Sequence, residues 1–165
     1  MSPPLGPPTF DVVSDALEIH CGTINCHGND ARNMRFYGFY GVRASADDQT
    51  GARPTTGDEY KRNYESIIAI EPEKISQIYL SGGQNSGKWI VLSKGRGTEH
   101  HKGGSRIVPG DALDTCILSW LLTRVPVVSD GGTFVTTDGA IPGTLNMSAC
   151  IAAVKILPPG ADWTQ

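Results

Sequence analysis

Glycine and proline interrupt this chain so often that no long helix or strand fits between them. The 165 residues include 20 Gly and 11 Pro, and only 19% are charged, against the usual quarter in soluble domains. Turns are therefore abundant, and helices with charged outer faces are scarce. A chain of this length supports one domain with its own core.

Short apolar runs lie between the turns and favour β-structure. They are rich in β-branched and aromatic residues or alternate in polarity, as strands do. These runs span residues 17–21, 34–42, 66–70, 75–80, 89–92, 116–123, 133–137 and 145–156. We therefore expect an all-β domain over 11–165, an antiparallel β-sandwich or jelly roll of about eight strands, with 44–61 as one long loop.

Residues 111–123 also fit one short helix. Asp111 precedes an apolar stripe with helical spacing, made by Leu113, Ile117, Trp120 and Leu121. The same segment alternates in polarity as a strand does, and Pro126 after it suits a sheet edge. A strand is the preferred interpretation, and a helix is the alternative.

The first ten residues form a proline-rich arm. Four prolines within residues 3–8 favour an extended, polyproline-like conformation and remove backbone donors. Leu5 and Phe10 offer apolar surface, so we expect them to anchor the arm on a neighbouring subunit of a homo-oligomer. Deleting residues 2–9 should then weaken assembly and leave thermal unfolding nearly unchanged.

A glycine-rich segment at 82–88 resembles a phosphate-binding loop in part. It reads Gly-Gly-Gln-Asn-Ser-Gly-Lys, but Trp89 stands where a Ser or Thr would hold magnesium. Residues 89–92 favour a strand rather than the helix that such a loop needs. The sequence therefore predicts a hairpin here, no binding of ATP or GTP, and no cofactor.

The cysteines and histidines form a second candidate site. His20-Cys21 and Cys26-His27 make a mirrored pair around a short turn. On two strand ends only one residue of each pair can face a given side, which predicts no structural zinc. A Cys21–Cys26 disulfide and simple buried thiols are the alternatives. The N-terminus lacks the pattern of a secretory signal, so reduced thiols are expected, including buried Cys116 and Cys150.

Positive charge gathers between residues 88 and 106. Five Lys and Arg face one Glu there, although the whole chain has a net charge of −3. The segment is predicted to contact an anion, a nucleic acid or an acidic surface; a solvated loop is the simpler alternative. The contact residues would be Lys94, Arg96, Lys102 and Arg106.

No local motif identifies a reaction, so no catalytic or metal-binding residue is assigned. The low charge, the arm and the turn-rich composition favour a non-enzymatic, self-assembling structural protein of viral coat, decoration or tail type, in a virion or the cytoplasm. A glycan-binding lectin is the alternative, with contacts from Gln84, Asn85 and Asp130. A small hydrolase or nuclease using the loop histidines ranks third. No apolar stretch is long enough to span a membrane.

Overall fold

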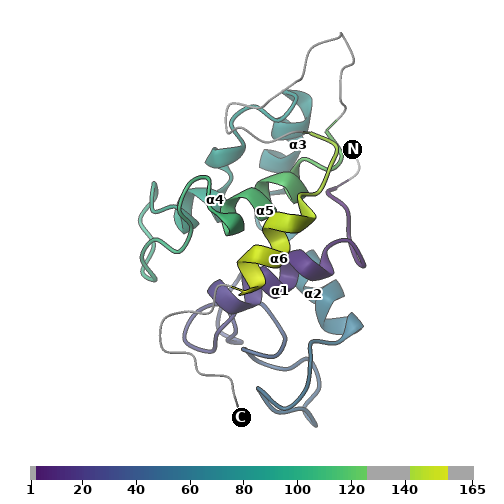
Figure 1. Cartoon of the computed structure of the whole chain (residues 1–165). Helices are drawn as coiled ribbons and strands as arrows, with labels where there is room; N and C mark the ends of the chain where they lie inside the picture. The colour runs from purple at the N-terminus through teal and green to yellow at the C-terminus, as the bar shows by residue number, and fades with distance from the viewer. Residues whose placement is uncertain (1–2, 126–141, 156–165) are drawn as a thin grey trace.

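The computed structural model describes residues 3–125 and 142–155, and these residues form helices rather than strands (Figure 1). Helices make up 43% of the described residues, and these residues contain no β-strand. The expected all-β sandwich or jelly roll is therefore wrong. The helices are α1 (Asp11–His20), α2 (Gly57–Ile68), α3 (Pro72–Leu80), the short 3-10 helix η1 (Ser86–Lys88), α4 (Ile90–Gly95), α5 (Ala112–Leu121) and α6 (Met147–Lys155).

Local capping signals explain where several helices begin. The hydroxyl of Thr56 accepts the N–H of Glu59, and the Glu59 carboxylate accepts the N–H of Thr56, so α2 begins with a capping box. Pro72 opens α3 at a position where its missing N–H costs nothing. Asp111 accepts the N–H of Asp114 at 2.7 Å at the start of α5. The helical alternative for 111–123 is thus confirmed, and α2 begins inside the expected 44–61 loop.

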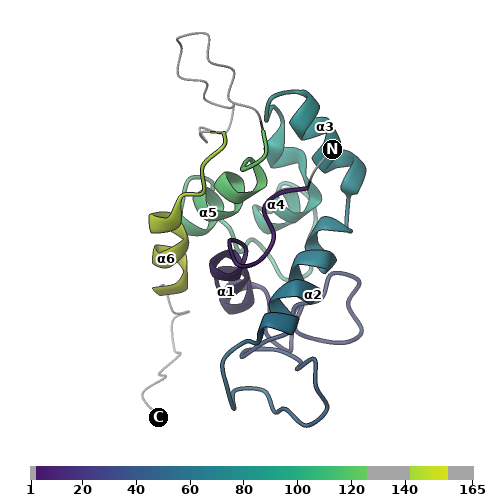
Figure 2. The same cartoon turned by 90° about the vertical axis from the view of Figure 1, so that its right-hand side faces the viewer.

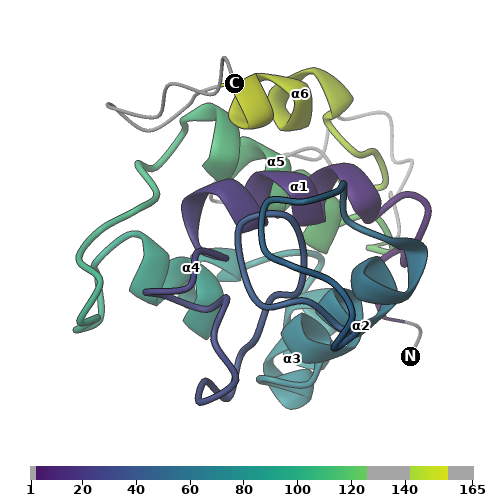
Figure 3. The same cartoon turned by 90° about the horizontal axis from the view of Figure 1, so that it is seen from below.

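Helix α1 lies at the centre of the molecule. It contacts α5 and α6 on one side and α2 on the other (Figures 2 and 3). Aromatic side chains fill the core between them, with the rings of Phe10 and Trp120 4.9 Å apart and those of Trp89 and Trp120 6.3 Å apart. None of the helices in the described ranges is long and apolar enough to cross a membrane.

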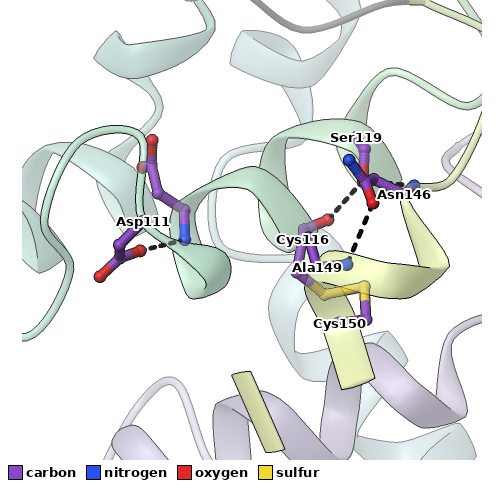
Figure 4. The surroundings of a disulfide bond; sticks show 7 residues. Asp111, Cys116, Ser119, Asn146, Ala149 and Cys150 are labelled. Carbon is purple, nitrogen blue, oxygen red and sulfur yellow. Dashed lines mark hydrogen bonds between the residues drawn. A yellow bond between two sulfur atoms is a disulfide. The ribbon is translucent and has the colours of Figure 1, made fainter. Parts of the chain in front are cut away.

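A disulfide joins α5 to α6. Cys116 and Cys150 are both fully buried, as expected, but they are bonded to each other rather than reduced (Figure 4). Asn146 caps α6 by accepting the N–H of Ala149 at 3.0 Å, and its own N–H donates to the Ser119 hydroxyl. Residues 147–155 are therefore a helix stapled to its neighbour and not the expected long strand.

The N-terminal arm folds back onto its own domain. The N–H of Leu5 donates to the Thr123 hydroxyl at 3.2 Å, and the indole N–H of Trp120 donates to the carbonyl of Leu5 at 2.7 Å. The hydroxyl of Tyr64 donates to the carbonyl of Pro4. Phe10 is completely buried, which leaves it no surface for a neighbouring subunit. A subunit contact therefore stays a prediction at Leu5 alone.

Candidate functional site

The turn that follows α1 brings Cys21, Cys26 and His27 together. The helix ends at His20, and the backbone N–H groups of Cys21 and Gly22 still donate to its last carbonyls. The N–H of His27 then donates to the carbonyl of Cys21 at 2.9 Å, which closes the turn. Because these residues lie in a loop rather than on a strand, the alternation that would separate neighbouring side chains does not apply.

Close backbone packing holds this turn in place. A Cβ added to Gly28 would lie 2.6 Å from the Cα of Gly41, so neither position has room for a side chain. The N–H of Val42 donates to the carbonyl of Gly28 at 2.9 Å, and the N–H of Phe36 donates to the carbonyl of His27 at 2.8 Å. The loop after α1 is therefore tied to the segment at 36–42.

A cavity of about 330 Å³ opens beside the turn. Cys21 and His27 line it, together with His101 from the connection between α4 and α5. An adjoining, more polar cavity of about 510 Å³ is lined by Cys26 and by the same two histidines. Apolar side chains make up most of the wall of the first cavity: Leu17, Ala31, Met34, Ile70, Ile90, Val91 and Ile107.

Backbone hydrogen bonds fix the connection that contributes His101. The N–H groups of Arg106 and Ile107 donate to the carbonyl of Gly95 at 2.8 and 3.0 Å, which closes the base of the loop on α4. Near its tip, the N–H of Gly104 donates to the carbonyl of His101 at 2.9 Å. These bonds hold His101 next to the Cys21–His27 turn, which lies far from it in the sequence.

The two imidazoles at the cavity are stacked, and each has its Nδ1 next to a backbone carbonyl. Their ring centroids are 5.9 Å apart and their planes are parallel within 8°. Nδ1 of His27 lies 2.9 Å from the carbonyl of Met34, and Nδ1 of His101 lies 3.1 Å from the carbonyl of Gly104. Because a carbonyl only accepts, each Nδ1 carries the proton and donates it. In both rings the lone pair is then on Nε2, the nitrogen available to a metal.

Burial sets the protonation states of the groups in the site. Burial raises the pKa of the Cys21 thiol to about 12, with the neighbouring Cys26 adding to the effect and Arg106 opposing it. Burial also lowers the pKa of His27 below its ordinary value, against the hydrogen bond to Met34. At neutral pH the site therefore presents a protonated thiol and a neutral imidazole.

Positive side chains surround both cavities. Arg32 and Lys94 line both, Arg106 lines the apolar cavity, and Lys102 lines the polar one, while no Asp or Glu lines either. Three of the four predicted anion contacts thus gather at one place, and Arg32 joins them from the loop after α1. The remaining one, Arg96, instead pairs with Asp114 through bonds of 2.7 and 2.9 Å.

The other candidate positions lie away from this site. Gln84 and Asn85 belong to the turn between α3 and η1, where Asn85 has a left-handed φ of 61°, and Asp130 lies outside the described residues. Trp89 is the N-cap of α4, so the expected hairpin is wrong. The preceding element is the helix α3, which also differs from the strand that a phosphate-binding loop follows.

The mirrored His-Cys and Cys-His pairs do not assemble into a single four-ligand site. His20 points to α6, where its Nε2 lies 3.1 Å from the carbonyl of Ala153. Within residues 3–125 and 142–155, no group of three or more His, Cys, Asp or Glu side chains is placed to hold a metal ion. The absence of structural zinc stays a prediction. Comparison with known protein families, curated proteins and solved structures finds no match for this chain.

Proposed function

We propose that this chain is a haem protein of the c type that carries single electrons. Cys21 and Cys26 would hold the porphyrin through thioether bonds, and His27 and His101 would be the protein ligands of its iron, which would supply one-electron chemistry. The observation that carries the proposal is the pair of parallel imidazoles that line two adjoining cavities, with the thiol of Cys21 in the apolar one and that of Cys26 in the polar one.

The order of the residues supports covalent attachment. A pair of cysteines followed directly by histidine is the attachment pattern of c-type haem, usually with two residues between the cysteines. Here four residues separate Cys21 from Cys26, and His27 follows at once. Thioether bonds to such a cofactor would need both cysteines in the reduced form, and Cys21 and Cys26 are free thiols.

The separation of the two histidines fits two ligands of one iron, but their orientation does not. A porphyrin supplies four nitrogens in its plane, so its iron would need only two ligands from the protein. Two imidazoles that hold one iron point their Nε2 edges at it, because the lone pair lies in the ring plane. Here the rings are stacked with centroids 5.9 Å apart, so both rings would have to turn before an iron could bind between them. The donation from each Nδ1 to a backbone carbonyl is the arrangement that orients an imidazole toward a metal.

The cavities supply suitable surroundings. Ligand sites measure about 300–1,000 Å³, and the apolar cavity adjoins the polar one along His27 and His101. The apolar walls would cover the porphyrin, and Lys94 and Arg106 would pair with its two propionates. If His27 and His101 both held the iron, no coordination position would be left for a substrate, so electron transfer is the chemistry that the group would supply.

The Cys116–Cys150 disulfide supports maturation in an oxidising environment rather than in the cytoplasm. Self-assembly and glycan binding stay untested predictions, and no contact at the site favours either of them.

Expression with the haem-ligation machinery of c-type cytochromes tests the proposal. We expect one haem per chain that survives denaturing extraction, seen as the mass gain of one haem, with a low-spin ferric spectrum. Cys21→Ser and Cys26→Ser should each lose one thioether, which shifts the pyridine haemochrome band to longer wavelength. His101→Ala should keep the covalent haem and become high-spin, whereas His100→Ala, at the exposed neighbouring position, should change nothing. A wild-type chain without covalent haem, or a low-spin His101→Ala variant, would overturn the proposal.

A further inference from the structure

Another cavity, where α1, α2, α6 and the loop at 39–55 meet, combines two carboxylates with aromatic rings. Its volume is about 300 Å³, and it shares no lining residue with the two cavities beside the turn at 21–27. Asp15 and Glu18 line it from α1, and Tyr60 lines it from α2. No Lys, Arg or His is among the described residues of its wall. The cavity therefore offers negative charge and no positive charge.

Glu18 is buried without a cation to balance its charge. The residue is 2% exposed. Its carboxylate accepts the hydroxyls of Ser14 and Thr55 at 3.0 and 2.7 Å and the side-chain amide of Asn63 at 3.3 Å. None of the ion pairs in the described ranges includes Glu18 or Asp15. A buried carboxylate that only neutral groups contact is costly, and a bound cation would offset part of that cost.

The nearest cation, Arg43, is already paired with another carboxylate. Its guanidinium donates two bonds of 2.8 Å to Glu59 and one of 3.1 Å to the carbonyl of Pro54. Arg43 therefore balances the charge of Glu59 and leaves that of Glu18 available to a ligand.

Asp15 and Tyr60 keep the capacity to accept hydrogen bonds from a ligand. The Tyr60 hydroxyl donates to Oδ1 of Asp15 at 2.8 Å. This bond leaves Oδ2 of Asp15 and the hydroxyl oxygen of Tyr60 as acceptors. A primary ammonium has three N–H donors and no acceptor, so it matches these oxygens. Glu18, three residues along the same helix face, adds a second negative charge.

Aromatic and aliphatic side chains form the rest of the wall. The rings of Phe39 and Tyr40 have centroids 5.0 Å apart and planes at 75° to each other. Aromatic faces attract a cation within about 6 Å. Ile19, Pro54 and Val154 add apolar surface that can cover an alkyl chain.

We infer that this cavity binds a small organic amine as its ammonium ion, with Asp15 and Glu18 as the anionic partners and the aromatic walls around the carbon chain. The volume is at the lower end of the range for small-molecule sites, about 300–1,000 Å³, which favours amines of a few carbons. The inference does not depend on haem, because the two sites share no lining residue.

Calorimetric titration of the full chain with n-butylamine tests the site. At about pH 8 this amine keeps its proton, as the Lys side chain does with a pKa of about 10.4. We expect saturable binding of butylammonium. We expect none of 1-butanol, which has the same chain without the charge, and none of butyrate, which has the opposite charge.

Conservative variants identify the anionic partners. Asp15→Asn removes a charge and keeps an acceptor for Tyr60, and it should reduce the affinity for butylammonium roughly tenfold or more, as should Glu18→Gln. Glu65→Gln removes an equal charge at an exposed position of α2 and should have little effect. Because Asp15 is only partly buried, its variant tests the site even where Glu18→Gln lowers stability.

The pH dependence of binding gives a second readout. The charged or titratable groups that act on Glu18 are Asp15, Tyr40, Arg43 and Tyr60. Burial raises the pKa of both carboxyls above the ordinary values, with the Tyr60 bond opposing it at Asp15. The pKa values of the two tyrosines and of Arg43 are raised as well, so these groups keep their protons. The affinity for butylammonium should therefore rise from about pH 5 to about pH 8, as the carboxyls ionise.

Four results would overturn the inference: no saturable binding of butylamine, equal binding of 1-butanol, an equal loss in Glu65→Gln and Asp15→Asn, or an affinity that falls from about pH 5 to about pH 8. None of them bears on the proposed function, which the haem content of the chain tests separately.

Discussion

The arm of residues 3–10 should stabilise its own domain, and deleting residues 2–8 measures by how much. The deletion removes three hydrogen bonds, from Leu5 to Thr123, from Trp120 to Leu5 and from Tyr64 to Pro4. It also removes the cover that Leu5 and its neighbours give to the aromatic core.

The cost follows from which donors are left without partners. The Trp120 side chain is fully buried, and a buried donor without a partner costs about 1–3 kcal/mol. The Tyr64 hydroxyl and the Thr123 hydroxyl each lose a bond worth about 1 kcal/mol. The deleted chain no longer loses backbone entropy on docking, but proline makes that loss small. We expect a net destabilisation of about 2–4 kcal/mol.

Urea unfolding followed by tryptophan fluorescence measures the loss. A double-mutant cycle sharpens the test, because Tyr64→Phe should cost about 1 kcal/mol in the full chain and nearly nothing in the truncated one. Equal unfolding midpoints for the full and truncated chains, or an unchanged effect of Tyr64→Phe in both backgrounds, would refute the docked arm. That result would restore the expectation from sequence, in which the deletion affects assembly only.

Two other perturbations have effects of definite sign. Replacing Cys116 and Cys150 together by Ala removes a cross-link between residues 34 apart in the sequence. Chain entropy predicts that the free energy of unfolding falls by about 4 kcal/mol, which chemical denaturation measures. An equal unfolding midpoint of the wild type with and without reductant would argue against the disulfide. Burial raises the pKa of Glu18 from its ordinary value of 4.5 to about 7, with the nearby charge of Asp15 adding to burial and hydrogen bonds from Thr55 and Ser14 opposing it. The folded state therefore binds this proton more tightly than the unfolded chain does, so the stability present below pH 4.5 is lost as the pH rises through about 7. In the wild type the free energy of unfolding should fall by a few kcal/mol between pH 5 and 8, and Glu18→Gln should remove this fall. An unchanged pH dependence in the variant would contradict the raised pKa of Glu18.

The sequence predicts a single turn-rich domain, but its helices are so short that their hydrophobic patterns also fit strands. A nine-residue helix such as α6 contains few full turns, so its apolar positions also satisfy a two-residue period. Capping residues indicate the helices more reliably than the hydrophobic pattern does. Thr56 with Glu59, Pro72 after Glu71, and Asp111 each mark a helix start in the sequence itself. Giving these residues more weight than β-branched composition would have recovered three of the helices.

The candidate site was predicted in pieces. The positive charges of Lys94, Lys102 and Arg106 do gather, and Cys21, Cys26 and His27 were singled out as a possible ligand set. The sequence gives no sign that His101 joins them, since its approach depends on the bonds from Arg106 and Ile107 to Gly95 that fold its loop back on α4. Contacts between distant segments of this kind have no local pattern.

The error in secondary structure also explains the error in chemistry. On a strand, Cys21 and His20 would face opposite sides, and so would Cys26 and His27, so no more than two of these side chains could share a site. Because α1 ends at His20, the chain leaves the helix as a closed turn, and Cys21 and His27 line the same cavity. A zinc ion would still need two more ligands from the protein, and within the described ranges no group of three or more His, Cys, Asp or Glu is placed to hold a metal ion. The end of one helix thus decides which of these side chains can share a cavity.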